Sequence, residues 1–354
     1  MSRLRVLLDA TWAAGRGGTA RYVRSLADAL SADPTIDIIV VRSPRLTRGP
    51  RAVRLPLNGS VHLLWTQLCL PLLARHHGAD VVQSTMTAPL RCPRPVVLTL
   101  HDALDFVPEL RPSRIWSWYM QTVGVLAARR AAVVLTGTRA SAAEIVRCYR
   151  LAPEKARVTP YGSAMVRLTV DCHDTTGANP CPGCTYALLV GTADKRKDFE
   201  TALRAIALVR ATGSDLAAVV VGSAPAAYAD AAWVRVVVDI DDGQLASLYR
   251  RAALVLVSSR HEGYGLPVLE ALAFGTPVVA SDIAALREVG GEAVRYAAPG
   301  DAEAFARQIV PLLEDPAGER ERVRRSTSAG SVARWGATAR ATTDVYREVL
   351  GART

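Results

Sequence analysis

Apolar residues along the chain follow two patterns that alternate regularly. Short apolar runs, which predict buried strands, are separated by longer stretches in which apolar residues recur every three or four positions, as in amphipathic helices. In the first half of the chain the predicted strands are residues 3–9, 36–41, 80–83, 96–100 and 133–136. The predicted helices there are residues 20–30, 63–74, 114–130 and 141–149. Strands that alternate with helices indicate βαβ units and a parallel sheet, so the expected fold class is α/β.

The pattern stops over residues 163–184, which are polar and contain glycine, proline and three cysteines, and then starts again. The later predicted strands are residues 186–190, 216–221, 234–238, 254–257 and 278–280. The later predicted helices are residues 199–211, 244–251, 267–274 and 302–313, with an arginine-rich helical region up to about residue 350. We therefore expect two Rossmann-like domains over 1–165 and 183–325, a linker over 166–182, and a C-terminal helix in 326–354 that returns towards the first domain. Ligands of such sheets bind at the carboxyl ends of the strands, here in the cleft expected between the domains.

Length and composition exclude several classes of protein. The 354 residues give room for two domains that each bury a core. No apolar run reaches the ~18 to 20 residues that a membrane-spanning helix needs. The first apolar run ends at Asp9 and is too short for a signal peptide, so the default expectation is a cytoplasmic protein. Six cysteines in this length are too few and too unevenly spaced for a disulfide scaffold.

The positive charge of the chain lies in its first half. Residues 1–166 contain 22 Arg and Lys against 10 Asp and Glu, whereas the remainder contains 21 against 23. A basic half suggests anionic partners such as phosphates or lipid headgroups. An arginine-rich, alanine-rich coding bias explains the same excess equally well, and both interpretations stay open here.

The most informative segment is residues 258–281, SSRHEGYGLPVLEALAFGTPVVAS. A predicted strand ends before it, two glycines allow the backbone to approach a ligand closely, and Pro267 opens a helix where its missing N–H costs nothing. Amides at the start of that helix suit anionic or hydroxyl oxygens. Glu262 precedes the helix and Glu270 lies one turn into it, so the two carboxylates can accept hydrogen bonds from separate hydroxyl groups. A capping glutamate beside a solvated one is the alternative interpretation.

This segment resembles the signature of the family-four retaining glycosyltransferases, which have the GT-B fold. The family motif has two glutamates separated by seven residues, the spacing of Glu262 and Glu270. The resemblance extends along nearly the whole chain. It implies that Glu262 contacts the donor sugar and Glu270 the ribose. It also implies that sugar and phosphates meet the backbone of Gly263, Tyr264, Gly265 and Leu266.

A second match is Gly-Thr-Ala-Asp-Lys-Arg-Lys-Asp over residues 191–198, directly after a predicted strand. The family places an arginine and a lysine on the diphosphate at this point, and Arg196 and Lys197 fill those places. A departing nucleoside diphosphate gains negative charge in the transition state, and fixed cations stabilise it without a metal. A solvated charge run is the alternative, but the chain has only three lysines and two of them gather here.

Two weaker matches lie in the first half. Gly17 and Gly18 form a glycine turn before a helix, similar to the family loop that approaches the donor phosphates and the acceptor. His101 follows a strand end, where the family often has a histidine facing the donor sugar. A structural role for His101 is an equally good interpretation.

Two further features are weaker, and the first of them has no family counterpart. Cys172, Cys181 and Cys184 resemble a zinc knuckle, although the adjacent Cys172 and His173 can hardly both bind one ion. The aromatic run Trp116, Trp118 and Tyr119, with Arg111 and Arg114, fits a membrane-surface face, but core packing of these aromatics is favoured.

The resemblance implies a retaining hexosyltransferase that uses a GDP- or UDP-sugar donor and acts in polysaccharide or glycoconjugate biosynthesis. No catalytic metal or other cofactor is expected. The expected acceptor is a sugar, an anionic or lipid-linked glycan or a small molecule, with peripheral contact to the inner face of a membrane through the basic half. Nucleic acid is not an expected partner. The alternatives are a sugar-nucleotide epimerase of the same fold and a non-catalytic basic binding protein.

Overall fold

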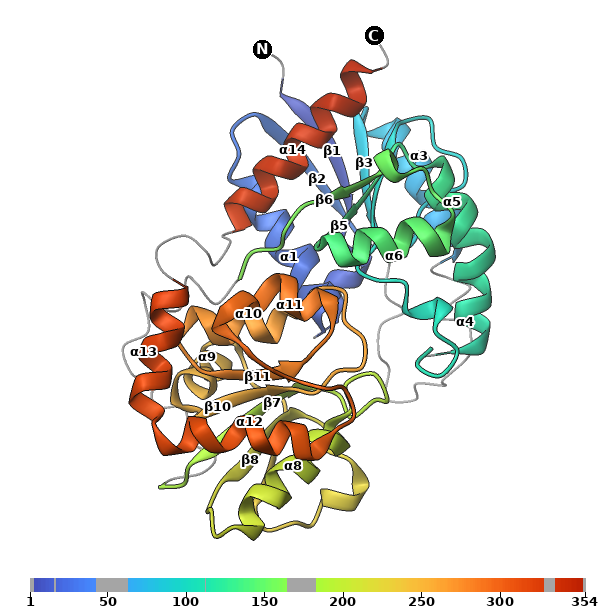
Figure 1. The fold of residues 1–354 in the computed structure, drawn as a ribbon. Coiled ribbons are helices and arrows are strands. Elements are labelled where there is room, and N and C mark those ends of the chain that lie inside the picture. Colours follow the sequence, from blue (N-terminus) through green and yellow to red (C-terminus); the bar gives the residue numbers. More distant parts are fainter. Residues whose placement is uncertain are drawn as a thin grey trace, which may run out of the picture. The chain divides into compact units, whose positions relative to one another are not determined.

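The computed structural model describes residues 3–15, 17–42, 63–111, 113–163, 183–327 and 335–352. The chain forms two compact units (Figure 1): unit 1 comprises Met1–Tyr161 and Trp335–Thr354, and unit 2 comprises Gly162–Arg334. None of the described helices combines the length and the apolar character needed to cross a membrane.

Unit 1 is built on a parallel six-stranded sheet with the strand order β2-β1-β3-β4-β5-β6. Its strands are β1 (Leu4–Asp9), β2 (Ile36–Val41), β3 (Val81–Thr85), β4 (Val96–Thr99), β5 (Val133–Thr136) and β6 (Ala156–Val158). Its helices are α1 (Gly18–Ser31), α3 (Leu70–His76), α4 (Arg114–Tyr119), α5 (Val125–Arg130), α6 (Arg139–Tyr149) and α14 (Trp335–Gly351). The inner strands are buried on both faces: β4 and β5 are mainly apolar, whereas β3 ends in the buried polar residues Gln83, Ser84 and Thr85.

Unit 2 repeats this architecture with the strand order β12-β11-β10-β7-β8-β9, again all parallel. Its strands are β7 (Tyr186–Gly191), β8 (Ala217–Gly222), β9 (Val234–Val237), β10 (Leu254–Val257), β11 (Val278–Ser281) and β12 (Arg295–Ala297). Its helices are α8 (Phe199–Ala211), α9 (Asp242–Arg251), α10 (Leu266–Ala273), α11 (Ala284–Gly290), α12 (Ala302–Glu314) and α13 (Pro316–Ser326). The α/β fold class expected from the pattern is confirmed in both units.

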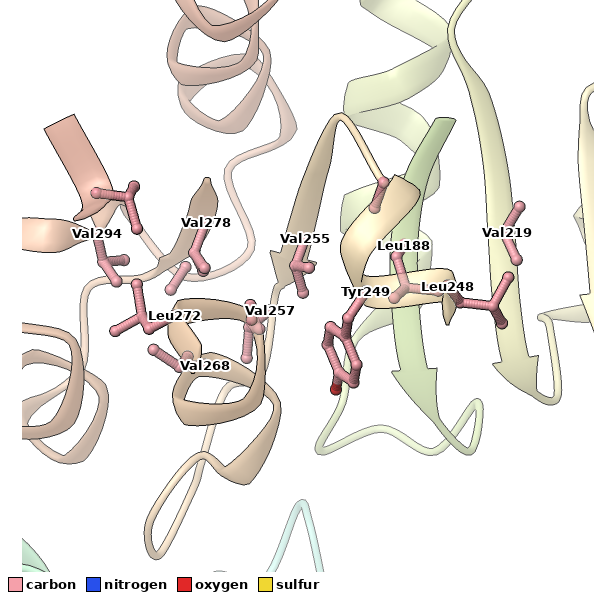
Figure 2. Close-up of a cluster of buried hydrophobic side chains, with 14 of the residues drawn as sticks. Leu188, Val219, Leu248, Tyr249, Val255, Val257, Val268, Leu272, Val278 and Val294 are labelled. Carbon is pink, nitrogen blue, oxygen red and sulfur yellow. The ribbon is translucent and has the colours of Figure 1, made fainter. Parts of the chain in front are cut away.

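Each face of the unit 2 sheet is covered by helices over a separate apolar cluster. Figure 2 shows one of them, in which Leu188 and Val255 of the sheet meet Leu248 and Tyr249 of α9. The other cluster packs Phe199 and α8 with α12 against the opposite face. Alternate residues of each strand therefore enter different clusters, which fixes the strand register and the position of the loops at the strand ends.

The C-terminal helix α14 is tied to the sheet of unit 1 by buried polar contacts. The Tyr346 hydroxyl donates to Gln83 Oε1 on β3 at 3.0 Å, and the Thr338 hydroxyl donates to the Pro160 carbonyl at 2.6 Å. Because Tyr346 and Thr338 are nearly inaccessible to solvent, these hydrogen bonds specify where the helix docks.

The structure differs from the sequence-based expectation in two long helices. The expected helix over 114–130 consists of α4, a π-helical turn Met120–Gly124 and α5, and the expected helix over 63–74 begins with a π-helical turn Trp65–Cys69 before α3. The aromatic run in α4 also divides: Tyr119 is buried and Trp116 packs against the core, whereas Trp118 is exposed. Core packing of all three aromatics was therefore the wrong expectation for Trp118.

Candidate functional site

The strand order of unit 2 creates a topological switch point between β7 and β10. From β7 the chain winds towards β9 on one side, and from β10 it winds towards β12 on the other. The two connections leave the carboxyl ends of β7 and β10 in opposite directions, which opens a crevice where open α/β sheets bind ligands. The segments that carry residues 192–198 and 258–265 follow these two strands.

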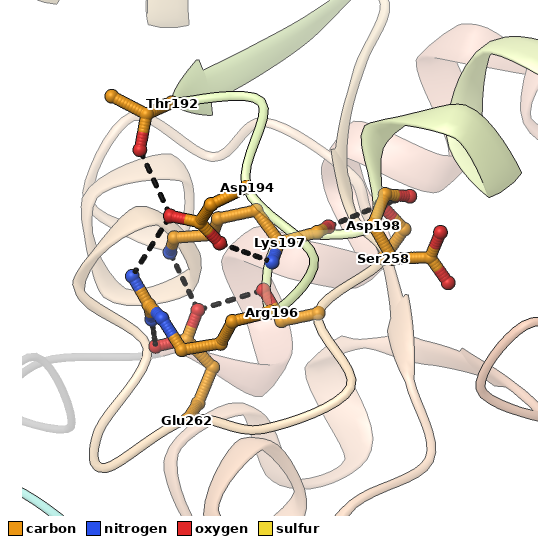
Figure 3. Close-up of polar contacts among 8 residues, drawn as sticks. Thr192, Asp194, Arg196, Lys197, Asp198, Ser258 and Glu262 are labelled. Atoms are coloured by element: carbon orange, nitrogen blue, oxygen red, sulfur yellow. Dashed lines mark hydrogen bonds and ion pairs between the residues drawn. The ribbon is translucent and has the colours of Figure 1, made fainter. Parts of the chain in front are cut away.

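Three charged side chains meet at this switch point (Figure 3). Lys197 Nζ lies 2.5 Å from Glu262 Oε1, and Arg196 Nη1 lies 3.3 Å from Glu262 Oε2. The Glu262 side chain is 8% exposed, that of Lys197 is 12% exposed and that of Arg196 is 23% exposed. We call Arg196, Lys197 and Glu262 the ion triad. The structure thus brings Glu262 to two adjacent cations that lie more than sixty positions earlier in the sequence.

Backbone contacts hold the two loops of the ion triad against each other. The Ser258 hydroxyl donates to the carbonyls of Lys197 and Asp198 at 3.0 and 2.9 Å. The Arg260 amide donates to the Arg196 carbonyl at 2.8 Å. Because these contacts all bind the backbone of the first loop, the positions of the three charges do not depend on their own flexible side chains alone.

The first loop is a tight turn organised by Asp194. Its Oδ1 accepts the Lys197 amide at 2.9 Å, and its Oδ2 accepts the Thr192 hydroxyl at 2.9 Å. The same carboxylate lies 3.9 Å from Arg196, so the turn also holds that guanidinium near Glu262.

Glu262 is a permanently ionised carboxylate at neutral pH. Burial by itself would raise the pKa of Glu262, but Lys197 and Arg196, together with hydrogen bonds from Lys197 and Ser259, outweigh it and lower the pKa to about 2. The Ser259 hydroxyl donates to Oε1 at 2.7 Å. A group with this pKa cannot serve as a general acid at neutral pH, so its use is electrostatic or as a hydrogen-bond acceptor.

Asp198 and Arg260 form a supporting pair that the sequence motifs did not reveal. Asp198 is buried, has a left-handed backbone with φ of 47° and immediately precedes α8. Its Oδ2 accepts Arg260 Nε at 2.7 Å and the Thr201 hydroxyl at 2.9 Å. An acidic residue directly before a predicted helix was the available signal, but its pairing with Arg260 depends on the tertiary fold.

The glycine-rich loop after Glu262 requires glycine at one position. Gly265 has φ of +93°, and a Cβ there would lie 2.4 Å from a Leu286 side-chain carbon. It is the N-cap of α10, whose first turn holds Leu266 and Pro267, and Tyr264 beside it is buried. The first amides of any helix have no hydrogen-bond partner one turn earlier. The positive φ of Gly265 lets the chain turn sharply, so that this end of α10 lies beside Gly263 and the ion triad.

Glu270 lies one turn into α10 and is fully buried. The Tyr249 hydroxyl of α9 donates to its Oε2 at 2.8 Å. Tyr249 is a second residue that the sequence analysis missed, because only the packing of α9 against α10 brings it to Glu270.

Of the site residues predicted in the first half, Gly18 opens the helix that packs against His101 within unit 1. Gly18 opens α1, and Tyr22 one turn later packs edge-on against His101 with ring centroids 4.9 Å apart. His101 Nδ1 lies 2.8 Å from the Tyr161 hydroxyl. Burial, partly opposed by Asp102, lowers the pKa of His101 to about 4, so the imidazole is neutral at pH 7.

The switch point of unit 1 lies between β1 and β3, and it contains buried oxygens without hydrogen-bond partners among the described residues. Asp9 Oδ1 accepts the Thr11 hydroxyl at 2.6 Å and Trp65 Nε1 at 3.3 Å, but Asp9 Oδ2 and Thr85 Oγ1 have no such partner. Orphan buried oxygens are costly and are typical of places that a water or ligand completes.

The predicted zinc ligands are only partly within the described residues. Cys172 and Cys181 lie outside them. Cys184 is disulfide-bonded, and a sulfur in a disulfide is not a thiolate ligand, so the zinc hypothesis loses Cys184 in this state. Within the described ranges no three acidic, histidine or cysteine side chains gather as a metal site would require.

Family models match both halves of the chain. The model described as "Glycosyltransferase Family 4" matches residues 16–163, and the model described as "Glycosyl transferases group 1" matches residues 185–315. The first match ends shortly after β6, and the second ends after α12.

Curated and solved relatives agree with these matches. The chain is 28% identical over 235 residues to O-antigen chain mannosyltransferase B of Escherichia coli, covering 62% of this chain and 61% of the relative. The chain therefore spans about three-fifths of the length of that relative. Its fold matches sucrose-phosphate synthase from Thermosynechococcus elongatus with a TM-score of 0.74 and 21% identity, covering 99% of this chain and 100% of that one. It also matches Anabaena Alr3699/HepE in complex with UDP and glucose, with a TM-score of 0.71, 16% identity and coverage of 98% and 100%. These structural neighbours share the GT-B fold.

Proposed function

Because the chain belongs to the family-four glycosyltransferases, we propose that it is a retaining hexosyltransferase that needs no metal ion. In this proposal it moves a mannose- or glucose-type sugar from a GDP- or UDP-sugar to an acceptor hydroxyl. The bond between the anomeric carbon and the diphosphate oxygen breaks, the acceptor oxygen forms the new glycosidic bond, and the acceptor proton leaves with the products. The sugar class is supported by the mannosyltransferase relative, and the nucleotide-sugar donor by the UDP and glucose in the HepE complex.

The ion triad is the observation that carries the proposal. Two fixed cations stand at the topological switch point of unit 2, where a diphosphate would lie near the start of α10. In the absence of donor, the Glu262 carboxylate forms ion pairs with both Arg196 and Lys197. A donor diphosphate would take over Lys197 and Arg196, and Glu262 would then be available to accept hydrogen bonds from the donor sugar and to stabilise a cationic sugar ring.

Electrostatic stabilisation by the ion triad accounts for the proposed independence from metals. Negative charge develops on the departing diphosphate in the transition state, and preorganised cations stabilise it without reorganisation. Glu270, held by Tyr249, would accept the ribose hydroxyls, and the Gly263–Leu266 backbone would meet the sugar and phosphates. His101, neutral by its lowered pKa, would act as a hydrogen-bonding group to the donor sugar.

We propose that unit 1 binds the acceptor, with Gly18 at the start of α1 approaching both substrates. The basic excess of this half favours an anionic or lipid-linked acceptor. In this proposal, the orphan oxygens of Asp9 and Thr85 at the β1/β3 switch point would form hydrogen bonds with acceptor hydroxyls. Acceptor binding that does not weaken between low and high salt would contradict the anionic acceptor, because exposed phosphate contacts are screened over about 8 Å at physiological ionic strength.

A donor screen tests the function. Nucleotide sugars with uracil or guanine bases are compared by thermal shift in EDTA, and the stabilising donor is then incubated with candidate acceptors. We expect release of nucleoside diphosphate in EDTA and a product whose anomeric proton coupling matches that of the donor. Loss of all turnover in EDTA would overturn metal independence. Conversion of the donor into an epimeric nucleotide sugar without release of nucleotide would identify an epimerase instead.

A further inference from the structure

Two helical stretches of unit 1 expose apolar side chains to an unusual degree. Among the residues that the structure describes, eleven large hydrophobic side chains are exposed, and more than half of them lie within 63–76 and 114–130. These six are Leu64, Leu68, Leu72, Ile115, Trp118 and Leu126. Ile115 is 82% exposed, Leu72 66% and Trp118 65%. Single exposed apolar residues are ordinary, but a concentration on two helices is typical of an interaction surface.

The exposed side chains form outward stripes on helices whose other side is buried. Leu64, Leu68 and Leu72 are spaced four apart and so lie on one face. Leu70 and Ala74 of the same stretch are fully buried in the core of unit 1. In the second stretch Met120 and Ala127 are likewise buried in this core. Each stretch is therefore apolar on two sides, and among the residues that the structure describes only one of these sides is packed against the protein.

The two stretches are neighbours in the fold. Residues of both stretches enter the same apolar cluster, Leu70 and Ala74 from the first and Tyr119 and Ala127 from the second. Figure 1 shows α3 and α5 next to each other on unit 1. The two stretches that carry the six exposed side chains thus pack on one core, and we call these six side chains together the Leu72/Trp118 face.

The charged side chains that the two stretches themselves carry have one sign. Exposed arginines stand at the helix ends, namely Arg75 after Leu72, Arg114 before Ile115, and Arg129 and Arg130 after Leu126. No acidic residue occurs from 38 to 79 or from 110 to 143. An acidic protein partner would be complementary to the arginines but not to the broad apolar stripes, whereas a bilayer with anionic headgroups is complementary to both.

We propose that the Leu72/Trp118 face docks on the surface of a bilayer that contains anionic lipids. The leucines, Ile115 and Trp118 would enter the boundary between headgroups and acyl chains, and the arginines would contact headgroup phosphates. Docking would hold unit 1 at the membrane without any membrane-spanning segment. It does not depend on the proposed transferase activity, because the surface is separate from the ion triad and carries its own chemistry.

Vesicle co-sedimentation tests the proposal without donor or acceptor. The full chain is mixed with vesicles of phosphatidylcholine alone and with an equimolar mixture of phosphatidylcholine and phosphatidylglycerol. We expect binding to the anionic vesicles that weakens as salt increases, and little binding to phosphatidylcholine alone. Equal binding to both compositions, or none to either, would overturn the proposal.

Variants locate the binding surface. Leu72→Ser combined with Trp118→Ser should weaken vesicle binding at least about tenfold, because the buried apolar area is lost. Val238→Ser, at another exposed apolar position, should leave binding unchanged. Arg114→Ala should weaken binding about fivefold, equivalent to ~1 kcal/mol for one arginine near an anionic surface, whereas Arg204→Ala in unit 2 should have no effect. Thermal unfolding of each variant confirms that it folds.

The oligomeric state separates a membrane surface from a protein interface. We expect the Leu72→Ser/Trp118→Ser variant and the wild type to have the same mass by light scattering. A wild-type dimer that this variant dissociates, with no difference in vesicle binding, would assign the face to self-association and contradict the proposal.

Discussion

The two switch points of the molecule differ in chemistry although the sheets around them have the same construction. Between β7 and β10 of unit 2, two cations and one carboxylate are paired at 2.5 and 3.3 Å and supported by backbone hydrogen bonds. Between β1 and β3 of unit 1, the groups are a carboxylate and a hydroxyl with unused hydrogen-bonding capacity. A charged, preassembled site suits a ligand whose charge is always the same, whereas a site with unfilled hydrogen bonds suits a neutral hydroxyl. The comparison predicts that variants in unit 2 change turnover and nucleotide binding, and that variants in unit 1 change the use of acceptor.

The largest expected effect is that of Lys197→Ala on turnover. Its ammonium acts where the diphosphate gains charge, so kcat should fall by about 10² to 10³, which corresponds to the ~2.7 to 4 kcal/mol typical of one such group. KM for the donor should change much less. Steady-state release of nucleoside diphosphate in EDTA measures both constants. Lys195→Ala, an exposed neighbour, is the matched control and should resemble wild type; a Lys197→Ala variant with near wild-type kcat would remove the ion triad from the mechanism.

Glu262→Gln should separate the two roles assigned to Glu262. Loss of the charge that stabilises the sugar ring should lower kcat by up to about 10². The same change frees Lys197 and Arg196 from their carboxylate, so nucleoside diphosphate should bind more tightly than to wild type. Titration calorimetry with GDP and UDP checks the second effect. Weaker nucleotide binding by this variant would mean that Glu262 organises the site and does not compete for the cations.

Glu270→Ala should act mainly through nucleotide affinity. A ribose is held alike in the ground and transition states, so KM should rise about tenfold or more while kcat changes little. Tyr249→Phe removes only the hydrogen bond to Glu270, so it should also raise KM, but by a smaller factor. A selective fall in kcat for either variant, measured by the same nucleotide release, would place Glu270 at the reacting centre and not at the ribose.

The smallest expected effects concern pH and His101. Since the pKa of His101 is lowered from 6.5 to about 4, its protonation should not appear in the activity profile between pH 6 and 8. The unfolded state binds a proton below about 6.5 and the folded state only below about 4, so the stability associated with His101 is lost as the pH falls through this window. The thermal unfolding temperatures of wild type and His101→Gln at several pH values measure this loss of stability. If the unfolding temperature falls equally steeply with decreasing pH in both proteins, His101 does not contribute to it.

Much of the fold was accessible from local sequence patterns. The strand Ile36–Val41 and the helix Phe199–Ala211 have the predicted bounds, because each has a clear apolar period and a clear boundary. The short strands β6 and β12 and the helix α11 were missed, since three to seven residues give too little periodicity. The π-helical turns were equally invisible, because one additional residue per turn barely changes an apolar pattern.

The site residues that belong to sequence motifs were predictable, whereas those that only packing brings to the site were not. Arg196, Lys197 and Glu262 were selected from two segments after strands, and the structure brings their charged groups together. Asp198, Arg260 and Tyr249 support the site through contacts that no spacing in the sequence indicates. The exposure of Trp118 could not be predicted from the sequence either. Its neighbours Trp116 and Tyr119 face inward, and only the orientation of the helix distinguishes Trp118 from them.

Binding of nucleoside diphosphate in EDTA tests the central claim most directly, because it needs no acceptor. GDP and UDP are titrated calorimetrically into wild type, Lys197→Ala and Lys195→Ala. We predict that wild type binds one of the two nucleotides at one site per chain, that Lys195→Ala binds it equally well, and that Lys197→Ala binds it measurably more weakly. No binding of either nucleotide by wild type, or equal binding by wild type and Lys197→Ala, would contradict a donor site built on the ion triad of unit 2.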